Sequence, residues 1–535
     1  MNLKWCKWKA ETGIHITLYL LADISLQESR VIEMQVLFCA SEAAPFAKTG
    51  GLADVAGSLP ESLHALGCDV RIFMPLYRSV RENSTTLDPV TKGIIIPVGG
   101  NDYHVHLWES RTESGVPIYF LEKDEFFDRS YLYGSPIRGD YEDNAERFIV
   151  FSLAVRQLCE AIEWYPSIFH LHDWQTGLVA PYLRLNWRQY PRFGRSGTVF
   201  TIHNIAYQGV FPAGSFRLTN LPPSAWSLQG IEFWGQCNFL KAGLVYSDFL
   251  TTVSPRYAVE ITTKNFGCGL EGLLRERKGS LRGILNGIDV NAWNPQTDCY
   301  LPANYSGDNL AGKKVCKEAL CKRVGLAEKT CRLPLLGMIG RLADQKGFDL
   351  LEKVLPDLMK LPVNLVILGT GDAAIEESIR DMERLYPDRL KLFSHYDEEM
   401  AHLIEGGADI FLMPSRYEPC GLGQMYSLRY GTIPIVHATG GLDDSVSDIL
   451  RHPDSGTGFK FYQYETGAFL EAIKSALELF EDGRKWIQIQ KRAMSQDFSW
   501  DRSARQYIEV YEMVLKAKKP FGFRPGPVSA LKHKD

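Results

Sequence analysis

Short apolar runs alternate with amphipathic stretches from Gln35 onward, and a polar or glycine-rich turn follows each run. Residues 36–40 have the length of a buried strand, and the leucines and valine that follow from position 52 recur at the three- and four-residue steps of a helix. The same pattern predicts strands at residues 69–74, 167–171, 198–202 and 248–253, a β-rich stretch over 93–121 and a helix over 144–162.

The alternation of strand, turn and helix restarts after Leu285. Strands are predicted at residues 333–339, 363–368, 390–393, 410–413 and 433–436, and helices at 348–361, 466–480 and 503–516. Two successive runs of this kind predict an α/β protein with two Rossmann-like, doubly wound parallel-sheet domains. Because such sheets bind ligands beyond the carboxyl ends of their strands, we expect the site in the cleft between the two domains.

The pattern also predicts where the domains begin and end. Residues 1–33 do not share it: three lysines precede a short apolar patch, but acidic residues follow and no small-residue cleavage site is evident. We therefore expect this segment to be an extension outside the fold rather than a secretory or transit peptide. We expect the first domain over residues 34–285, the second over 286–500, and a final helix with a loose tail over 501–535.

Composition excludes several classes of function. Fifty-nine basic residues against 64 acidic ones give a net charge of −5, which offers no electrostatic reason to bind nucleic acid or an anionic membrane. No apolar run approaches the ~18–20 residues of a membrane span. The 11 cysteines form no C-x-x-C pair and have no zinc-like spacing with histidine, so we expect a reducing compartment and no metal site.

Two loops between a strand and a helix combine glycine with a cation. In K-T-G-G-L-A-D, Gly50 and Gly51 let the backbone approach a ligand, the helix start offers N–H groups to an anion, and Lys48 adds a charge. In G-R-L-A-D-Q-K-G, Arg341 and Lys346 predict a clamp for a diphosphate. The structural alternative for the first loop is a glycine turn with a solvated lysine. For the second loop it is a solvated basic loop.

Three further polar loops follow predicted strands. The segment S-R-Y-E-P-C-G-L-G-Q over 415–424 offers a carboxylate and a glycine backbone, which suit a ligand with many hydroxyl groups. H-L-H-D-W-Q over 170–175 and T-I-H-N over 201–204 place polar groups at strand ends in the first half. A single histidine is more often structural than catalytic, but two such loops in one half favour a site.

With these motifs the chain resembles the bacterial glycogen synthases and plant-type starch synthases, the ADP-glucose-using glucan elongases. The resemblance covers about residues 34–515. It is carried, in family order and spacing, by K-T-G-G-L-A-D at 48–54, H-D-W at 172–174, T-I-H-N-I-A-Y-Q-G at 201–209, N-G-I-D at 286–289, G-R-L-A-D-Q-K-G at 340–347, S-R-Y-E-P-C-G-L at 415–422 and T-G-G-L at 439–442.

The resemblance implies a GT-B fold, in which an N-terminal acceptor domain faces a C-terminal donor domain and the last helix returns to the first domain. It implies transfer of glucose from ADP-glucose to the non-reducing 4-hydroxyl of an α-1,4-glucan, with retention and with neither metal nor cofactor. The absence of a D-x-D motif agrees with this. The implied partners are ADP-glucose and glycogen or starch, with no nucleic acid and no membrane, in the bacterial cytoplasm rather than a plastid.

The resemblance also assigns roles to residues. Arg341 and Lys346 would neutralise the leaving diphosphate, Glu418 would accept hydrogen bonds from glucose hydroxyls, and His203 would hold the ring at its primary hydroxyl. The donor-binding candidates are Lys48, Gly50, Gly51, Asp54, Tyr396 against the adenosine, Cys420, Gly421 and Leu422, and those on the acceptor side are Asn144, Asp173 and Trp174. No motif places a carboxylate as a nucleophile, so front-face attack on an oxocarbenium-like centre is the hypothesis for the mechanism.

Three positions depart from familiar patterns. Gly423 stands where many relatives carry threonine, and Asp443 where alanine is common. Tyr426 stands where the wider retaining class often has a second glutamate, and the glucan synthases share this tyrosine.

Two alternatives to glucan synthesis remain. One is another retaining GT-B enzyme that uses UDP-glucose or an acceptor other than a glucan. The other is an inactive glucan-binding or priming scaffold, which should have lost charged donor groups. The sequence retains all of these groups: Lys48, Asp54, Arg341, Lys346 and Glu418.

Overall fold

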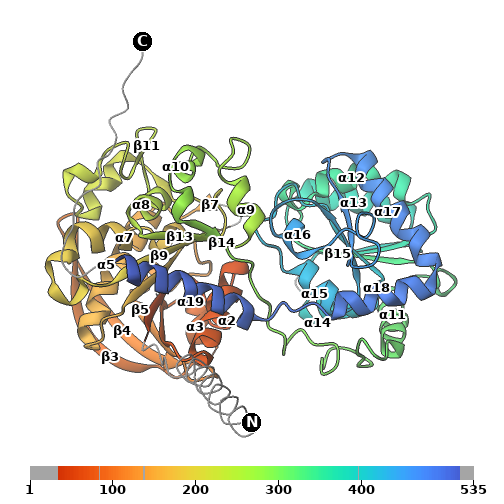
Figure 1. The fold of residues 1–535 in the computed structure, drawn as a ribbon, viewed down its shortest axis with the longest axis horizontal. Helices are drawn as coiled ribbons and strands as arrows, with labels where there is room; N and C mark the ends of the chain where they lie inside the picture. The colour runs from red at the N-terminus through yellow and green to blue at the C-terminus, as the bar shows by residue number, and fades with distance from the viewer. Residues whose placement is uncertain (1–33, 84, 136–138, 396, 519–535) are drawn as a thin grey trace, which may run out of the picture.

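The computed structural model describes residues 34–518, apart from 84, 136–138 and 396. It has two lobes, each built around a wholly or mainly parallel sheet with helices packed against it (Figure 1). The extension at 1–33 and the end of the tail lie outside the described residues. The expected α/β fold with two Rossmann-like domains is confirmed.

The first lobe contains a nine-stranded sheet in the order β14-β13-β9-β8-β1-β2-β5-β4-β3. Its strands pair in parallel except at β3–β4 and β4–β5, which form the antiparallel edge predicted as a β-rich stretch. The strands are β1 Gln35–Cys39, β2 Asp69–Pro75, β3 Asp88–Val98, β4 Asn101–Arg111, β5 Pro117–Glu122, β8 Ile168–His172, β9 Gly197–Ile202, β13 Phe249–Thr252 and β14 Leu281–Gly283.

Helices and small sheets surround this sheet. The apolar stripe predicted after residue 52 is buried in α2, which begins at Gly51 and packs on β2. The helices are α2 Gly51–Ala65, α3 Arg78–Glu82, α4 Asp124–Phe127, α5 Asn144–Ala161, α6 Asp173–Thr176, α7 Val179–Pro181, α8 Phe239–Tyr246, α9 Pro255–Glu260 and α10 Glu271–Glu276, and the short strands are β6 Gly134–Ser135, β7 Gly139–Asp140, β10 Val210–Phe211, β11 Glu232–Phe233 and β12 Gln236–Asn238.

The second lobe contains a six-stranded, fully parallel sheet in the order β17-β16-β15-β18-β19-β20. This is the strand order of the doubly wound dinucleotide-binding fold. The strands are β15 Leu335–Ile339, β16 Asn364–Leu368, β17 Leu390–Phe393, β18 Ile410–Met413, β19 Ile433–His437 and β20 Phe459–Phe461. The helices are α11 Ala311–Val324, α12 Phe348–Leu358, α13 Ala373–Leu385, α14 Glu398–Gly407, α15 Gly423–Arg429, α16 Gly440–Ser445, α17 Thr466–Glu481 and α18 Gly483–Met494.

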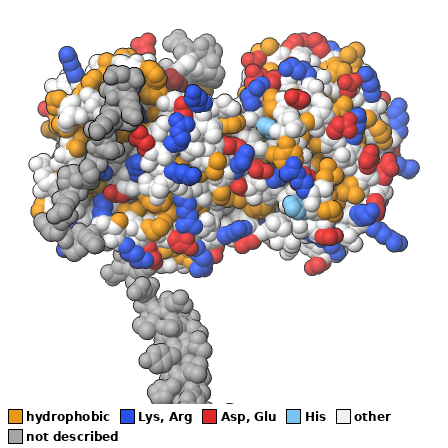
Figure 2. All heavy atoms as spheres, turned by 45° about the horizontal axis from the view of Figure 1, so that its top comes forward, with side chains coloured by type: hydrophobic (Ala, Val, Ile, Leu, Met, Phe, Trp, Pro, Cys, Tyr) orange, Lys and Arg blue, Asp and Glu red, His pale blue; other side chains and the backbone are white. Residues whose placement is uncertain are grey.

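The last helix, α19 Trp500–Ala517, crosses from the second lobe onto the first, where it packs on α2 and β9 (Figure 1). Its buried face includes Tyr507, Val510, Tyr511 and Val514. The chain passes between the lobes twice. The two crossings run side by side, since Ile288 forms a β-bridge with Ser499. On the face shown in Figure 2, a notch at the top separates the two lobes.

Candidate active site between the two lobes

Four of the predicted loops lie at the points where the strand order of each sheet reverses. In the first lobe this point lies between β1 and β8, and K-T-G-G follows β1 while H-D-W follows β8. In the second lobe it lies between β15 and β18, and G-R-L-A-D-Q-K-G follows β15 while Y-E-P-C-G-L follows β18. The carboxyl ends of strands at such a reversal leave a crevice for ligands. The two sheets therefore each contribute two loops to one candidate site.

A buried carboxylate holds the K-T-G-G loop in place. Glu42 accepts hydrogen bonds from the Thr49 backbone N–H at 2.5 Å and from the hydroxyl of Tyr133 at 3.0 Å. Burial raises the pKa of Glu42, and the bonds from Thr49 and Tyr133 oppose that rise. A Cβ added at Gly50 or Gly51 would meet no atom within 4 Å, so open space lies beside these glycines. The sequence analysis did not identify Glu42. Its position between β1 and the two glycines is the feature that could have indicated it.

Lys48 is half exposed and paired within its own loop. Its Nζ lies 2.6 Å from Asp54 Oδ1, on the first turn of α2. Burial raises the pKa of Asp54, whereas the neighbouring ammonium lowers it. The two predicted donor-binding charges are thus adjacent, and the pair leaves part of the Lys48 side chain open to solvent.

The loop with Arg341 and Lys346 packs against the loop with Glu418. Gly347 adopts a left-handed φ of 81°, and a Cβ there would lie 2.0 Å from the Pro414 carbonyl oxygen, so only glycine allows this approach. Lys346 Nζ donates to Glu418 Oε2 at 2.6 Å, and the Ser415 hydroxyl donates to the same oxygen at 3.1 Å. Glu418 is 5% exposed.

Arg341 contributes a more open cation to the same loop. It is exposed, and it forms no ion pair with the described residues, where its one hydrogen bond goes to Gln345 at 3.3 Å. The second lobe therefore presents one accessible guanidinium beside one paired ammonium.

The backbone around Cys420, Gly421 and Leu422 is supported by the T-G-G-L segment. A Cβ on Gly440 would lie 1.9 Å from the Glu418 carbonyl oxygen, and the Gly441 N–H donates to that oxygen at 3.1 Å. Cys420 is buried, and burial raises its thiol pKa to about 12. The thiol is therefore neutral, and the segment offers its backbone rather than a nucleophile.

The candidate histidine of the first lobe is held by its neighbours. The backbone N–H of His203 donates to Asp173 Oδ1 at 2.7 Å, and His203 Nε2 lies 2.9 Å from His172 Nδ1. Burial lowers the pKa of His203 to about 3 and raises that of Asp173 to about 7. His203 is therefore a neutral imidazole at physiological pH.

The other two acceptor-side candidates are engaged inside the first lobe. Asn144 is 2% exposed, and its amide donates to the Tyr133 carbonyl and accepts from Arg147. The Trp174 ring packs edge-on against Phe148 at 4.9 Å. Asn144 therefore supports the wall beside the site through its amide, and Trp174 does so through its ring. Tyr396 lies outside the described residues.

The two lobes touch next to these loops. Glu260, on α9, accepts hydrogen bonds at 3.1 and 3.2 Å from the Gly440 N–H and the Thr439 hydroxyl at the start of α16. The backbone N–H of Arg256 donates to Asp444 Oδ2 at 2.7 Å. This contact holds the T-G-G-L segment, and through it the Glu418 loop, against the first lobe. No local pattern in the sequence predicts this contact, because the partners lie about 180 residues apart.

The departures noted in the sequence find local explanations. Asp443 Oδ1 lies 2.8 Å from Lys460 Nζ, and Asp443 Oδ2 lies 3.8 Å from Arg256 Nε. The carboxylate of Asp443 therefore takes part in the contact between the lobes. A Cβ on Gly423 would lie 3.2 Å from the Phe411 ring, which leaves little room for a larger side chain. Tyr426 stacks on Trp293 with ring centres 3.9 Å apart.

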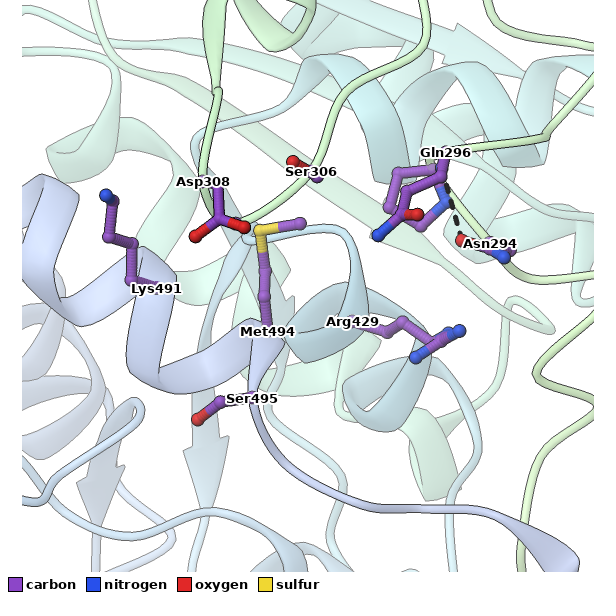
Figure 3. Close-up of a pocket in the computed structure, with 10 residues that line it drawn as sticks. Asn294, Gln296, Ser306, Asp308, Arg429, Lys491, Met494 and Ser495 are labelled. Atoms are coloured by element: carbon purple, nitrogen blue, oxygen red, sulfur yellow. Dashed lines mark hydrogen bonds between the residues drawn. The ribbon is translucent and has the colours of Figure 1, made fainter.

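A pocket of about 230 Å³ lies elsewhere in the second lobe (Figure 3). Its side chains come from the linker around Asn294, Gln296 and Asp308 and from α15 and α18. Arg429, at its edge, donates to the backbone carbonyls of Trp293 and Val290, so its guanidinium fastens the linker to α15. None of the predicted site residues lines this pocket.

Two general observations bear on metals and membranes. Within residues 34–518 and their stated gaps, no group of three or more His, Cys, Asp and Glu side chains is arranged to hold a metal ion. Among the helices that the structure describes, none is both long and apolar enough to cross a bilayer.

Comparison with known proteins found two matching family models and several similar relatives. Residues 35–276 match the family model of the starch synthase catalytic domain, and residues 328–493 match that of the glycosyl transferases group 1. The glycogen synthase of Koribacter versatilis is 46% identical over 91% of this chain and 99% of its own length. The glycogen synthase of Anaeromyxobacter sp. is 49% identical over 89% and 99%.

Solved structures agree with these relatives. The catalytic domain of starch synthase IV from Arabidopsis thaliana, bound to ADP and acarbose, matches with a TM-score of 0.84 and 34% identity over 90% of this chain and 99% of that one. The sucrose-phosphate synthase of Thermosynechococcus elongatus matches with a TM-score of 0.56 and 18% identity, which supports the fold alone.

Proposed function

The chain belongs to the family of bacterial glycogen synthases and starch synthases and is a glucosyltransferase of glycogen or starch synthesis, and from this premise we propose its substrates. We propose that glucose passes from ADP-glucose to the non-reducing 4-hydroxyl of an α-1,4-glucan, with retention and without a metal or cofactor. The observation that carries this proposal is the cluster of Arg341, Lys346 and Glu418 at the strand-order reversal of the second sheet.

The cations of the cluster suit the leaving group. Departure of a nucleoside diphosphate develops negative charge, which a guanidinium and an ammonium stabilise without a metal ion. Arg341 is exposed and Lys346 is held beside it in one loop. Lys48, in the loop between β1 and α2, would contact the diphosphate from the first lobe. The ADP bound to the similar starch synthase IV supports an adenine nucleotide as the carrier.

The remaining groups suit the sugar. Glu418 accepts hydrogen bonds from Lys346 and Ser415 and would accept them from glucose hydroxyls in the complex. His203 would hold the primary hydroxyl as a neutral group, so it adds no positive charge beside an oxocarbenium-like centre. No motif places a carboxylate as a nucleophile, and the Cys420 thiol is neutral and buried. We therefore favour front-face attack, in which the departing phosphate accepts the proton of the acceptor hydroxyl.

We also propose a location for the enzyme. The two glycogen synthases compared above are bacterial, and the ten cysteines within the described residues are all free thiols. We place the enzyme in the bacterial cytoplasm.

Incorporation of labelled glucose into glycogen tests the proposal. Parallel assays with ADP-glucose and UDP-glucose, each with and without a chelator, should give the higher kcat/KM with ADP-glucose and no loss with the chelator. Equal or better use of UDP-glucose would favour the alternative donor. Absence of transfer from either donor by folded protein would favour the scaffold.

A further inference from the structure

Three buried imidazoles lie side by side beneath the candidate site. His170 and His172 project to the same side of β8, because they are two residues apart on one strand. Their ring centres lie 4.2 Å apart, and His172 and His203 lie 5.2 Å apart. Only His203 has been assigned a role, so the question is what its two neighbours do.

His170 has a hydrogen-bond partner at each ring nitrogen. Its Nδ1 lies 2.7 Å from the hydroxyl of Tyr511 on α19, and its Nε2 lies 2.7 Å from the hydroxyl of Thr201 on β9. Both partners can donate or accept, so His170 can adopt either tautomer. It serves to fasten the last helix to the sheet.

His172 has a partner at one nitrogen only. Its Nδ1 lies 2.9 Å from His203 Nε2, while its Nε2 is buried and has no hydrogen-bond partner. The ring stacks on Phe38 with centres 4.0 Å apart. A buried N–H without an acceptor is rarer in proteins than a buried lone pair without a donor. The proton of neutral His172 therefore belongs on Nδ1, from which it is donated to His203.

This assignment determines the tautomer of His203. Its Nε2 accepts the proton of His172 and must carry the lone pair, so the proton of the neutral ring lies on Nδ1. Among the described residues no group forms a hydrogen bond with His203 Nδ1, while Asp173 holds the backbone of the same residue at 2.7 Å. The ring nitrogen left for a ligand is thus an N–H group.

We propose that His172 is a positioning residue that fixes His203 as the Nδ1–H tautomer, so that His203 donates a hydrogen bond to a sugar oxygen. The inference rests on the proposed role of His203 at glucose. A neutral donor can bind the sugar oxygen without placing a full positive charge beside the reacting carbon.

Nitrogen NMR of histidine-labelled protein without substrate tests the tautomer directly. Protonated and unprotonated ring nitrogens give separate 15N signals, and couplings to the ring carbon-bound protons identify Nδ1 and Nε2. The His203 signals are assigned by their loss in His203→Asn. We expect a protonated Nδ1 and an unprotonated Nε2 in the parent. The opposite pattern would overturn the proposal, whatever the donor sugar proves to be.

Two substitutions at His172 separate positioning from packing. In His172→Asn the side-chain amide can take the place of the Nδ1–H donor, whereas His172→Leu fills space without a donor. We expect His172→Leu to lower kcat about tenfold, the worth of one hydrogen bond, and His172→Asn to restore most of that loss. His170 lies on the same strand but bonds to Tyr511, so His170→Asn is the matched control. It should leave the His203 signals in place. Equal kcat in the parent and folded His172→Leu, or equal losses in both His172 variants, would contradict the proposal.

Discussion

Lys346 Nζ lies 2.6 Å from Glu418 Oε2. The cation expected at the diphosphate and the carboxylate expected at glucose are therefore bonded to each other before any ligand is bound. The pair is more than three-quarters buried on both sides, so neither charge is left alone in a region of low dielectric. This bond holds the two groups close enough to contact the diphosphate and the glucose of one nucleotide sugar. A donor that contacts both side chains would share or replace the bond.

Lys48→Ala should weaken binding of the donor. The substitution removes one charge-assisted contact from the first lobe, which is worth ~1.5–3 kcal/mol, so KM for ADP-glucose should rise about ten- to a hundredfold. Lys360→Ala removes a comparable exposed lysine that pairs with Asp357 at 2.7 Å on a helix of the second lobe, and it serves as the control. Donor kinetics that are unchanged in Lys48→Ala would remove this residue from the site.

The buried imidazoles predict a loss of stability in acid. Burial keeps His170, His172 and His203 neutral, with a native pKa of about 3 for His203 against 6.5 for the unfolded residue. Between these values the unfolded chain binds more protons, so the melting temperature should fall as the pH drops below about 6.5.

Asp173 opposes this trend. Its native pKa of about 7 lies above the unfolded value of 3.8, so between these values the folded protein holds a proton that the unfolded chain has lost. Near pH 5 the four groups together give an uptake of about two protons on unfolding, three from the histidines minus one from Asp173. The melting temperature of His203→Asn should therefore fall less between pH 6.5 and 4.5 than that of the parent. If the melting temperatures of the two proteins fell equally over this pH range, His203 would not be kept neutral in the folded protein.

Much of this architecture could be predicted from the sequence. Strand β18 begins and ends where its apolar run does, because a buried parallel strand is a continuous apolar segment flanked by turns. The loops with Lys48, Arg341 and Glu418 were found because each joins a strand to a helix and carries an unusual combination of glycine and charge.

Other features depend on contacts that no local pattern records. The pairing of Lys346 with Glu418 spans 72 residues, and that of Glu260 with Gly440 spans 180. Asn144 resembles an exposed polar residue in the sequence, yet Arg147 and Tyr133 bury its amide inside the first lobe. The sequence also gave no reason to separate His172 from His170, because their difference lies in the partners that β9 and α19 bring to them.

The lobes should close on the donor. Lys48 lies in one lobe and Arg341 in the other, and the chain crosses between the lobes near Ile288 and Ser499, so binding one diphosphate with both cations favours a hinge motion there. Small-angle scattering should give a smaller radius of gyration with saturating ADP or ADP-glucose than without. An identical radius in both samples would argue against closure.

Removal of residues 1–33 should leave folding and activity intact. The strand pattern begins at Gln35, and β1 is already at the centre of its sheet, between β2 and β8. A protein that starts at Met34 should match the full chain in melting temperature and kcat. Loss of solubility or activity would give the extension a structural role.

The kcat of Glu418→Gln, measured together with its melting temperature, tests the central claim most directly. Glutamine keeps the shape of the side chain but loses the charge, so we expect kcat with ADP-glucose and glycogen to fall by ~10²-fold or more, as when a preorganised polar contact to the transition state is removed. The melting temperature should change by only a few degrees, since about a quarter of the Lys346 side chain is open to solvent and the amide oxygen can still accept from Lys346 or Ser415.

Asp409→Asn is the matched control, because Asp409 pairs with Lys317 at 2.6 Å just before β18, at the opposite end of the strand that leads to Glu418. It should affect stability more than kcat. A Glu418→Gln protein with near-normal kcat and a strongly lowered melting temperature would show that this carboxylate is only a structural ion pair, and the assigned site would then be wrong.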